Sequence, residues 1–280
     1  MKQISLCSIA NVSSGNCSED CAYCTQSAHN HTNIEKYKFR STQDVVNQAK
    51  IMRSYGAVGF CLVTAGLGLD SKKCEYIAKL AFEISRLDLG LNLIACNGEA
   101  DVESLKYLRK NGIESYNHNL ETARSHFPKI CSTHTWESRY QTCQNAIEAG
   151  LNVVSGGIFG IGENEEQRHE HLKALATLNP KTSPINFFIP NPNLPIKQAI
   201  ISKKEALSLI TLARSYLPNA RLMIAGGREI VFGDDQEELF KSEINAVVLG
   251  DYLTTKGNNP ANEIEKIKNY GCEIATVCHG

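Results

Sequence analysis

Short apolar runs alternate with longer amphipathic stretches along the whole chain. Eight apolar runs have the length of buried strands, and they cover residues 4–9, 58–64, 91–96, 113–116, 151–154, 185–189, 221–225 and 246–249. Eight stretches with helical periodicity lie between or after them, at residues 42–55, 73–87, 101–110, 136–148, 163–178, 203–216, 236–241 and 261–269. Ser41 and Ser202 are suitable N-cap residues for two of these stretches, and glycines directly follow four predicted helices, at positions 56, 112, 150 and 271.

This alternation predicts the fold. A strand that leads through a helix to the next strand usually pairs with it in parallel, by a right-handed crossover. Eight such units predict a closed (β/α)8 barrel of the TIM type, in the α/β class. An open doubly wound sheet is the alternative, because one sequence does not give the order of the strands.

No linker divides the chain, so we predict a single barrel domain over residues 1–280. A run rich in proline and asparagine, at residues 190–195, follows the sixth predicted strand. We expect it to form a loop at the barrel mouth and not a domain boundary.

Composition narrows the classes of function. The net charge is −1 and the charges are mixed along the chain, so no basic face for nucleic acid is expected. The chain lacks an apolar run of about 18 residues, and its first residues lack the pattern of a signal peptide, so we expect a cytoplasmic protein without a membrane helix. The 11 cysteines, an odd number, are then expected to be metal ligands or reduced core thiols.

Three cysteines lie close together in the sequence CSEDCAYC. Cys17, Cys21 and Cys24 belong to a predicted loop, residues 12–33, that follows the first strand, and such loops line the active site of a barrel. One loop of this kind presents three sulfurs to one metal centre, whereas a closed zinc site or a saturated cluster takes four protein ligands. The remaining position is open for a reacting ligand. A structural zinc loop or chance clustering is the alternative.

Polar side chains follow the fourth predicted strand. Asn117, Asn119 and Glu121 alternate in the sequence, so they are expected to share the face that points to the barrel axis. Two carboxamides and a carboxylate suit a neutral, hydrogen-bonding substrate and a ribose diol. His118 then points away from the axis and is expected to be structural.

A glycine-rich segment, GGIFGIGE at residues 156–163, follows the fifth predicted strand. Glycines allow a ligand to lie close against the main chain. A phosphate-binding loop is one alternative, but no Gly-Lys-Ser or Gly-Lys-Thr sequence follows. A plain tight turn is the other.

The cysteine loop resembles the signature of the radical S-adenosylmethionine (SAM) superfamily. The resemblance implies a 4Fe-4S cluster with an open iron that binds SAM, held by Cys17, Cys21 and Cys24. It also implies that Tyr23 lies against the adenine, for which an ordinary packed aromatic is the alternative. By the same resemblance, Gly156 and Gly157 lie beside the cosubstrate.

The resemblance narrows to the biotin synthase family through five stretches in the family's order. They are SGNCSEDCAYCTQS at residues 14–27, YNHNLET at 116–122, SGGI at 155–158, PIN at 184–186 and AGGRE at 225–229. The resemblance implies radical sulfur insertion into dethiobiotin to give biotin, while SAM is cleaved to methionine and 5′-deoxyadenosine. It implies that Asn117, Asn119 and Asn186 hold the ureido ring. It also implies that Glu121 holds the ribose and that Arg139 pairs with the methionyl carboxylate, with a solvated helix position as the alternative for Arg139.

The resemblance further implies a reducing partner, such as a flavodoxin or ferredoxin, and a homodimer. Two other readings remain open at this point. A related radical SAM enzyme, such as a maturase or a mutase, shares the barrel but is not favoured by the Tyr-Asn-His-Asn run. A non-catalytic iron–sulfur carrier explains the cysteines but not the asparagines or Arg139.

The sequence departs from this family at the second, auxiliary cluster, which donates the sulfur. The family's usual ligands are cysteines on the second, third and fifth strands and an arginine on the seventh. Here Cys61 occupies the first of these positions, while the others hold Ile94, Val154 and Met223.

Other residues are candidates to replace the missing ligands. Cys96 lies two residues after Ile94 and Arg221 two residues before Met223, so each shares an inward face. We therefore predict an auxiliary cluster, 2Fe-2S or of another type, on Cys7, Cys61 and Cys96, with Arg221 or Cys131 as the fourth ligand. Buried core thiols are the alternative. Cysteines predicted to have packing roles or given no role are Cys74, Cys143, Cys272 and Cys278.

Overall fold

The computed structural model describes residues 1–278 of the chain, and within them ten parallel strands form one sheet. The strands are β1 (Lys2–Ser13), β2 (Gly59–Thr64), β3 (Asn92–Cys96), β4 (Ser115–Asn117), β5 (Asn152–Val154), β6 (Gly157–Phe159), β7 (Thr182–Phe187), β8 (Arg221–Ile224), β9 (Ala246–Val248) and β10 (Cys272–Ile274). The helices are α1 (Thr42–Ser54), α2 (Ser71–Ser85), α3 (Val102–Lys110), the 3₁₀ helix η1 (Phe127–Lys129), α4 (Trp136–Glu148), α5 (Glu165–Leu178), α6 (Lys203–Tyr216), α7 (Arg228–Phe232), α8 (Glu237–Lys241) and α9 (Pro260–Asn269).

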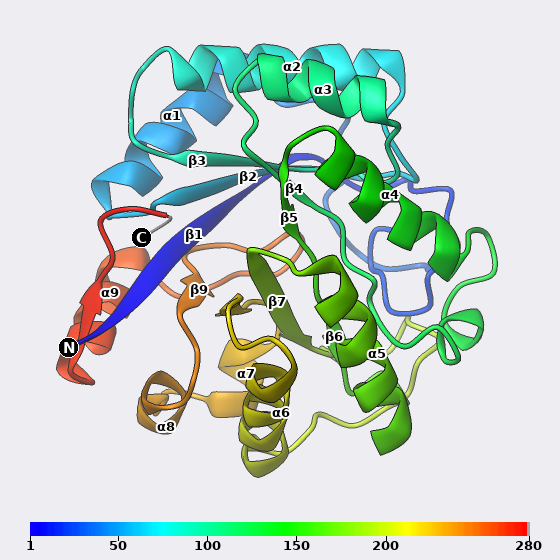
Figure 1. Ribbon diagram of the computed structural model, residues 1–280, viewed down its shortest axis with the longest axis vertical. Helices are drawn as coiled ribbons and strands as arrows, with labels where there is room; N and C mark the ends of the chain where they lie inside the picture. Colours follow the sequence, from blue (N-terminus) through cyan, green and yellow to red (C-terminus); the bar gives the residue numbers. More distant parts are fainter. Residues whose placement is uncertain (279–280) are drawn as a thin grey trace.

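The sheet closes into a barrel, because β9 pairs with β1 as well as with β8. The strands follow sequence order around the barrel, and the helices cover its outside (Figure 1). β5 and β6 together fill one barrel position, since both pair with β7. The eight barrel positions confirm the predicted (β/α)8 barrel of the TIM type.

Local sequence explains where the helices begin and end. Ser41 accepts a hydrogen bond from the Asp44 amide (3.1 Å), and Ser202 accepts one from the Glu205 amide (3.1 Å), so both predicted N-caps are confirmed. The glycines at positions 56, 112, 150 and 271 all have positive φ, which ends each helix at little steric cost. Apolar side chains from the helices and from the outward face of the strands pack into one core between the two layers.

The structure differs from the predicted elements in four places. The glycine-rich segment is expected to follow the fifth strand, but its residues 157–159 form a further short strand, β6, in the same barrel position. The short helices η1 and α7 have only three and five residues, too few to show a helical period in the sequence. β10 is a short added strand that pairs with the first residues of β1, outside the barrel.

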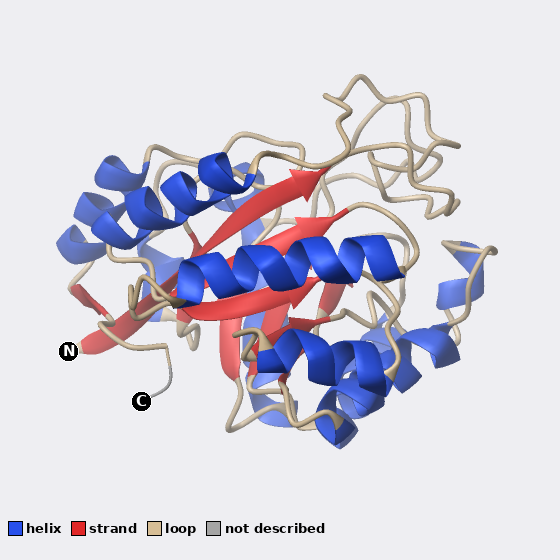
Figure 2. Ribbon diagram, turned by 90° about the horizontal axis from the view of Figure 1, so that it is seen from above, coloured by secondary structure: helices blue, strands red, loops and turns tan. Residues whose placement is uncertain are grey.

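All strands run the same way, so the barrel has two distinct ends. The strands point toward the end that carries the long loops, while both termini lie at the opposite end, which we call the floor (Figure 2). A cavity of about 360 Å³ lies inside the barrel, and its lining includes loop residues such as Tyr23 and Cys24 and floor residues such as Ser5 and Arg221. The chemistry predicted from the strand ends therefore has an enclosed space to act in.

Candidate functional site

The cysteine loop lies over the carboxyl end of the strands and is held by its own main chain. The Cys17 amide donates to the Gln26 carbonyl (3.1 Å), and the Cys17 carbonyl accepts from the Ala28 amide (2.8 Å). The Cys24 amide donates to the Cys21 carbonyl (3.0 Å), which forms a tight turn between the last two thiols. These backbone hydrogen bonds therefore fix the path of the loop that carries the three thiols.

Asn30 is a loop residue that the sequence analysis missed. Its buried amide donates to the carbonyls of Cys21 (3.1 Å) and Cys24 (2.9 Å), and so fixes the backbone that carries two of the thiols. A hydroxyl contact between Thr25 and Thr254 (2.8 Å) connects this loop to the segment after β9. The available sequence signal for the Asn30 contacts was an asparagine shortly after the cysteine motif, since asparagine side chains commonly bond to nearby backbone groups.

A polar network supports the loop from outside. Cys21 donates to Cys131 Sγ (3.7 Å), and this hydrogen bond lowers the pKa of Cys131 to about 4 while it raises the pKa of Cys21. Cys131 also contacts His134 Nδ1 (3.2 Å), and the same His134 nitrogen lies 2.7 Å from Glu19 Oε2. Asp20 accepts hydrogen bonds from the Ser132 amide (2.9 Å) and hydroxyl, and these bonds hold the pKa of Asp20 below its usual range even though burial opposes them.

The arrangement of the loop thiols argues against a single zinc ion. Tetrahedral zinc with four thiolates places the sulfurs about 3.8 Å apart, from its Zn–S bond length. Among the described residues, the one close group of metal-binding side chains consists of Cys21, Cys131 and His134, whose ligand atoms lie within 4.8 Å of one another. Cys17 and Cys24 lie outside this group, so the motif's three thiols are spread more widely than around one ion.

Cys131 was one of two candidates for the fourth auxiliary ligand, and the structure contradicts this. It packs beside Cys21 in a cluster that includes Phe127 and Ile130, outside the barrel, and it is not among the residues that line the cavity. The segment after η1 carries Cys131 across the cysteine loop, and sequence spacing alone did not show this. Cys131 therefore supports the upper loop.

Glu121 and Arg139 form a buried ion pair at the top of the cavity. Arg139 Nη2 lies 3.2 Å from Glu121 Oε1, Arg139 Nε donates to the Asn119 carbonyl (2.6 Å), and Nη1 contacts His134 (3.2 Å). Burial raises the pKa of Glu121, and the Arg139 charge opposes this shift. Burial alone would lower the pKa of Arg139, but the charges of Glu121 and of nearby groups such as Tyr23 and Cys21 together outweigh it, and the pKa is raised.

The residues after β4 enter the cavity as predicted. Asn117, Asn119 and Glu121 all line it, although β4 ends at Asn117 and Glu121 has a positive φ of 66°. His118 is buried beneath them, and its amide donates to the Val154 carbonyl (2.9 Å). Burial keeps the pKa of His118 well below its usual range, which confirms a neutral, structural histidine.

Two buried oxygen atoms in this cavity have no protein partner. They are Asn117 Oδ1 and Glu121 Oε2. Buried acceptors are almost always hydrogen-bonded, so these two mark places where a ligand's donor groups fit. An amide acceptor suits a ureido N–H, and a carboxylate oxygen suits a ribose hydroxyl.

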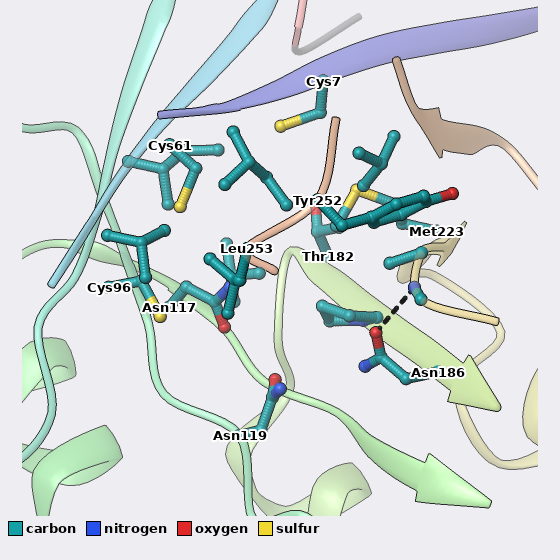
Figure 3. Close-up of a pocket in the computed structure, with 18 of the residues that line it drawn as sticks. Cys7, Cys61, Cys96, Asn117, Asn119, Thr182, Asn186, Met223, Tyr252 and Leu253 are labelled. Carbon is teal, nitrogen blue, oxygen red and sulfur yellow. Dashed lines mark hydrogen bonds between the residues drawn. The ribbon is translucent and has the colours of Figure 1, made fainter. Parts of the chain in front are cut away.

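Asn186 also lines the cavity, but both ends of its amide already bond to protein. Oδ1 accepts from the Gly226 amide (2.9 Å), as drawn in Figure 3, and Nδ2 donates to the Gly157 carbonyl (3.1 Å). These bonds tie the ends of three barrel strands together. Asn186 therefore has fewer hydrogen-bonding positions left for a ligand, whereas Asn117 Oδ1 has no protein partner.

The glycines at the end of β5 have a packing reason. A Cβ at Gly156 would lie 1.9 Å from the Pro184 carbonyl oxygen, and one at Gly157 would lie 2.4 Å from the Glu121 carbonyl oxygen. Neither glycine is among the residues that line the cavity. The structure thus explains both glycines by close strand packing, and their contact with the cosubstrate stays a prediction.

The AGGRE stretch also has a structural role. Gly227 has a φ of 83° and caps α7, and Arg228 is only 1% exposed. Arg228 pairs with Glu263 and Glu229, and Glu229 accepts a hydrogen bond from the Tyr252 hydroxyl (2.9 Å). This network fixes Tyr252, which lines the cavity and was missed from the sequence.

Three further thiols lie inside the barrel, where they were predicted. Cys7, Cys61 and Cys96 come from the neighbouring strands β1, β2 and β3, and all line the cavity (Figure 3). Their register explains this, because Cys61 pairs with Ile94 and Cys96 follows two residues later on the same face. Arg221 lines the same cavity lower down.

The surroundings of these thiols are mostly apolar. They pack with Val63, Val154 and Met223, and burial raises the pKa of Cys7 to about 12. Contact with Cys96 and burial likewise raise the pKa of Cys61. A bound metal would displace these protons, since a coordinating thiol is deprotonated outright. By contrast, Cys74 bonds to the Ser104 carbonyl and Cys143 to the His118 carbonyl, which confirms packing roles for both.

Comparison with known proteins places this site in a family. Residues 11–175 match the family model described as the radical SAM superfamily, and residues 184–273 match the model described as the biotin and thiamin synthesis associated domain. The two matches together run through one barrel. No helix of the described residues has the length and apolar character needed to span a membrane.

Individual relatives match over the full length. The chain is 59% identical over 277 residues to a biotin synthase of Helicobacter hepaticus, covering 99% of this chain and 98% of that protein. It is 59% identical over 282 residues to a biotin synthase of Helicobacter pylori strain G27, covering 100% of both. Among solved structures, the FeFe-hydrogenase maturase HydG from Carboxydothermus hydrogenoformans has a TM-score of 0.83 at 17% identity, covering 98% of this chain and 68% of that one, which shows a shared fold.

Proposed function

The chain belongs to the biotin synthase family of radical SAM enzymes, and we propose how its residues divide the work of inserting sulfur into dethiobiotin. As a member of that family it uses a 4Fe-4S cluster and SAM. We assign the cluster to Cys17, Cys21 and Cys24. When bound there, the cluster would supply the electron for SAM cleavage. That cleavage would give methionine and the radical that abstracts hydrogen from dethiobiotin.

One observation supports the substrate assignment most strongly. Asn117 Oδ1 and Glu121 Oε2 are buried acceptors without a protein partner, and both residues line the cavity between the cysteine loop and the interior thiols. A ureido ring on Asn117 and a ribose on Glu121 would satisfy both atoms. The substrate would then lie between the place where the radical forms and the place where sulfur is held.

The remaining polar residues would orient the cosubstrate. Arg139 holds Glu121 in place through the 3.2 Å contact and leaves Glu121 Oε2 for a ligand. We propose that its guanidinium also pairs with the methionyl carboxylate, because it is buried within reach of the loop that carries Cys21. Tyr23 lines the same cavity, and we propose that its ring lies against the adenine.

The lower part of the cavity fits a sulfur-donating cluster. Cys7, Cys61 and Cys96 supply the soft thiolate ligands that iron–sulfur clusters take, and Arg221 lies beside them. We propose that these three thiols hold the auxiliary cluster, of 2Fe-2S or another type. Their apolar surroundings would exclude water from the radical between the two sites.

We also propose the conditions under which the enzyme works. Reduction of the upper cluster calls for a small electron carrier such as a flavodoxin or ferredoxin. All 11 cysteines are unpaired, which suits the reducing cytoplasm. By resemblance to its family, the enzyme is proposed to act as a homodimer, which sedimentation of the purified protein would test.

The function is tested by the coupling between substrate and cosubstrate. Anaerobically reconstituted, reduced protein should cleave SAM faster when dethiobiotin is added, and biotin should form in the same reaction. Asn117→Ala should weaken the stimulation and raise the dethiobiotin concentration it needs. Cleavage that dethiobiotin does not stimulate, with no biotin formed, would overturn the proposed substrate.

A further inference from the structure

The C-terminal segment is fixed against the floor of the barrel. β10 pairs with β1 in parallel, with Lys2 opposite Cys272 and Ile4 opposite Ile274. The Ala275 amide then donates to the Ile4 carbonyl (3.0 Å), so the pairing continues just past the strand. The chain then continues at the end of the barrel where the strands begin, and Figure 2 shows the N-terminus at the same end.

This turn brings Cys278 to the interior. Cys278 lines the same cavity as Cys7, Cys61 and Cys96, although it lies 271 positions after the first of them. Arg221 Nη1 donates to Cys278 Sγ (3.5 Å), so the thiol is oriented toward the barrel wall of β8. Cys272, in the same terminal segment, instead contacts the Phe240 carbonyl (3.7 Å), outside the cavity.

All four thiols face one space. Cys7, Cys61, Cys96 and Cys278 line the same cavity, and the first three also pack together in one cluster inside the barrel. Arg221, which donates to Cys278 Sγ, lines this cavity as well.

The predicted fourth ligand, Arg221, is already engaged in this geometry. Its Nη1 donates to Cys278 Sγ (3.5 Å), so a thiol lies directly beside the guanidinium. Thiolate is the common protein ligand of iron–sulfur clusters. The positions of the family's usual ligands on the third, fifth and seventh strands hold Ile94, Val154 and Met223, none of which is a cysteine or an arginine. A three-thiol cluster thus lacks a fourth protein ligand unless another side chain supplies it.

We propose that Cys278 is the fourth ligand of the auxiliary cluster, which is then held entirely by cysteines: Cys7, Cys61, Cys96 and Cys278. Four thiolates are the common protein ligand set of both 2Fe-2S and 4Fe-4S clusters. Arg221 then stands beside the added negative charge of the fourth thiolate. This inference rests on the proposed function only in assuming that the three strand thiols hold a cluster.

The test measures iron, not turnover. Wild type, Cys278→Ser, Cys61→Ala and the matched control Cys272→Ala are reconstituted anaerobically with ⁵⁷Fe and read by Mössbauer spectroscopy. Cys278→Ser should lower the auxiliary-cluster signal at least about tenfold, since even residues outside the ligand shell cost that much in metal affinity. The 4Fe-4S signal of the upper loop should stay unchanged in Cys278→Ser and serves as the check on folding. Cys272→Ala should keep both signals.

The outcomes separate the two proposals. Auxiliary iron that survives in Cys278→Ser but is lost in Cys61→Ala would overturn the role of Cys278 alone. Auxiliary iron that survives in both variants, or that wild type never binds, would overturn the proposed strand site as well. A second readout needs no variant: Cys278 should be alkylated in the metal-free protein and protected at least tenfold after reconstitution. Equal alkylation in both states would contradict the proposal.

Discussion

The cysteine loop above the barrel and the thiols inside it are built in opposite ways. The loop gathers Cys17, Cys21 and Cys24 from eight consecutive residues and fixes them with hydrogen bonds of its own backbone. The interior group draws its thiols from separate strands and from the far end of the chain. The first site depends on local spacing, and the second depends on the register of the whole barrel.

Their surroundings differ as much as their construction. Two acidic residues of the loop, Glu19 and Asp20, bond to His134 and to the Ser132 amide, and Cys17 is partly exposed. The interior thiols instead lie among aliphatic side chains. The polar, accessible site suits entry of a charged cosubstrate and of an electron, while the enclosed site suits a radical step that must avoid water.

The largest expected effect separates the two sites directly. Cys24→Ala removes a proposed ligand of the upper cluster and should lower SAM cleavage at least about a hundredfold. The auxiliary iron should remain, because the interior thiols belong to the barrel strands and the C-terminal segment and not to the loop. The measurement combines 5′-deoxyadenosine production with Mössbauer spectra of the same sample. Cys74→Ala, a buried thiol between α2 and α3, is the control and should leave both unchanged. If Cys24→Ala also lost the auxiliary signal, the two sites would not be independent.

The second prediction compares two asparagines that lie between the sites. Asn117 has an unpartnered oxygen, whereas both ends of the Asn186 amide bond to the protein. Asn117→Ala should raise the dethiobiotin concentration that gives half-maximal stimulation of SAM cleavage roughly tenfold, because one hydrogen bond to the substrate is lost. It should hardly change the free energy of unfolding. Asn186→Ala should lower the free energy of unfolding by about 1–3 kcal/mol as well. Titration of stimulated SAM cleavage and urea unfolding measure the two effects, and equal loss of stability in both variants would contradict the assignment.

Much of the fold followed from the sequence because its signals are local. Alternating apolar runs and helical stretches predicted all eight barrel positions, and the caps at Ser41 and Ser202 are where they were expected. The cysteine motif was equally readable, since its three thiols are close in sequence. Period-two alternation even predicted that Cys96 faces inward, because a strand fixes the side of every second residue.

The remaining features depend on contacts between distant segments. Nothing near Cys131 in the sequence shows that its segment crosses the cysteine loop, and nothing near Cys278 shows that β10 carries it beneath β1. The double use of Asn186 by Gly157 and Gly226 likewise depends on three strands meeting. Such features follow from tertiary packing, which single-sequence patterns do not contain.

The smallest expected effect concerns how each region responds to pH. Burial raises the pKa of Glu121 from the ordinary value of 4.5, with Arg139 opposing. A raised folded pKa stabilises the protein fully below the unfolded pKa, and this stability is lost as the pH rises through the folded pKa. The metal-free wild type should therefore lose free energy of unfolding, relative to Glu121→Gln, as the pH rises from about 4.5 through the raised pKa of Glu121. Above that pKa, the difference in free energy of unfolding between the two proteins should stay constant.

Cys7, inside the barrel, should not respond in this window, because burial raises its pKa to about 12. Cys7→Ala should thus keep the wild-type dependence on pH between about 4.5 and 8, even if its stability is lower throughout. Urea unfolding of reduced, metal-free proteins at several pH values measures both differences. The prediction would be contradicted if Glu121→Gln kept the wild-type pH dependence of the free energy of unfolding while Cys7→Ala lost it. The pH dependence would then come from the interior thiol and not from the ion pair at the cavity mouth.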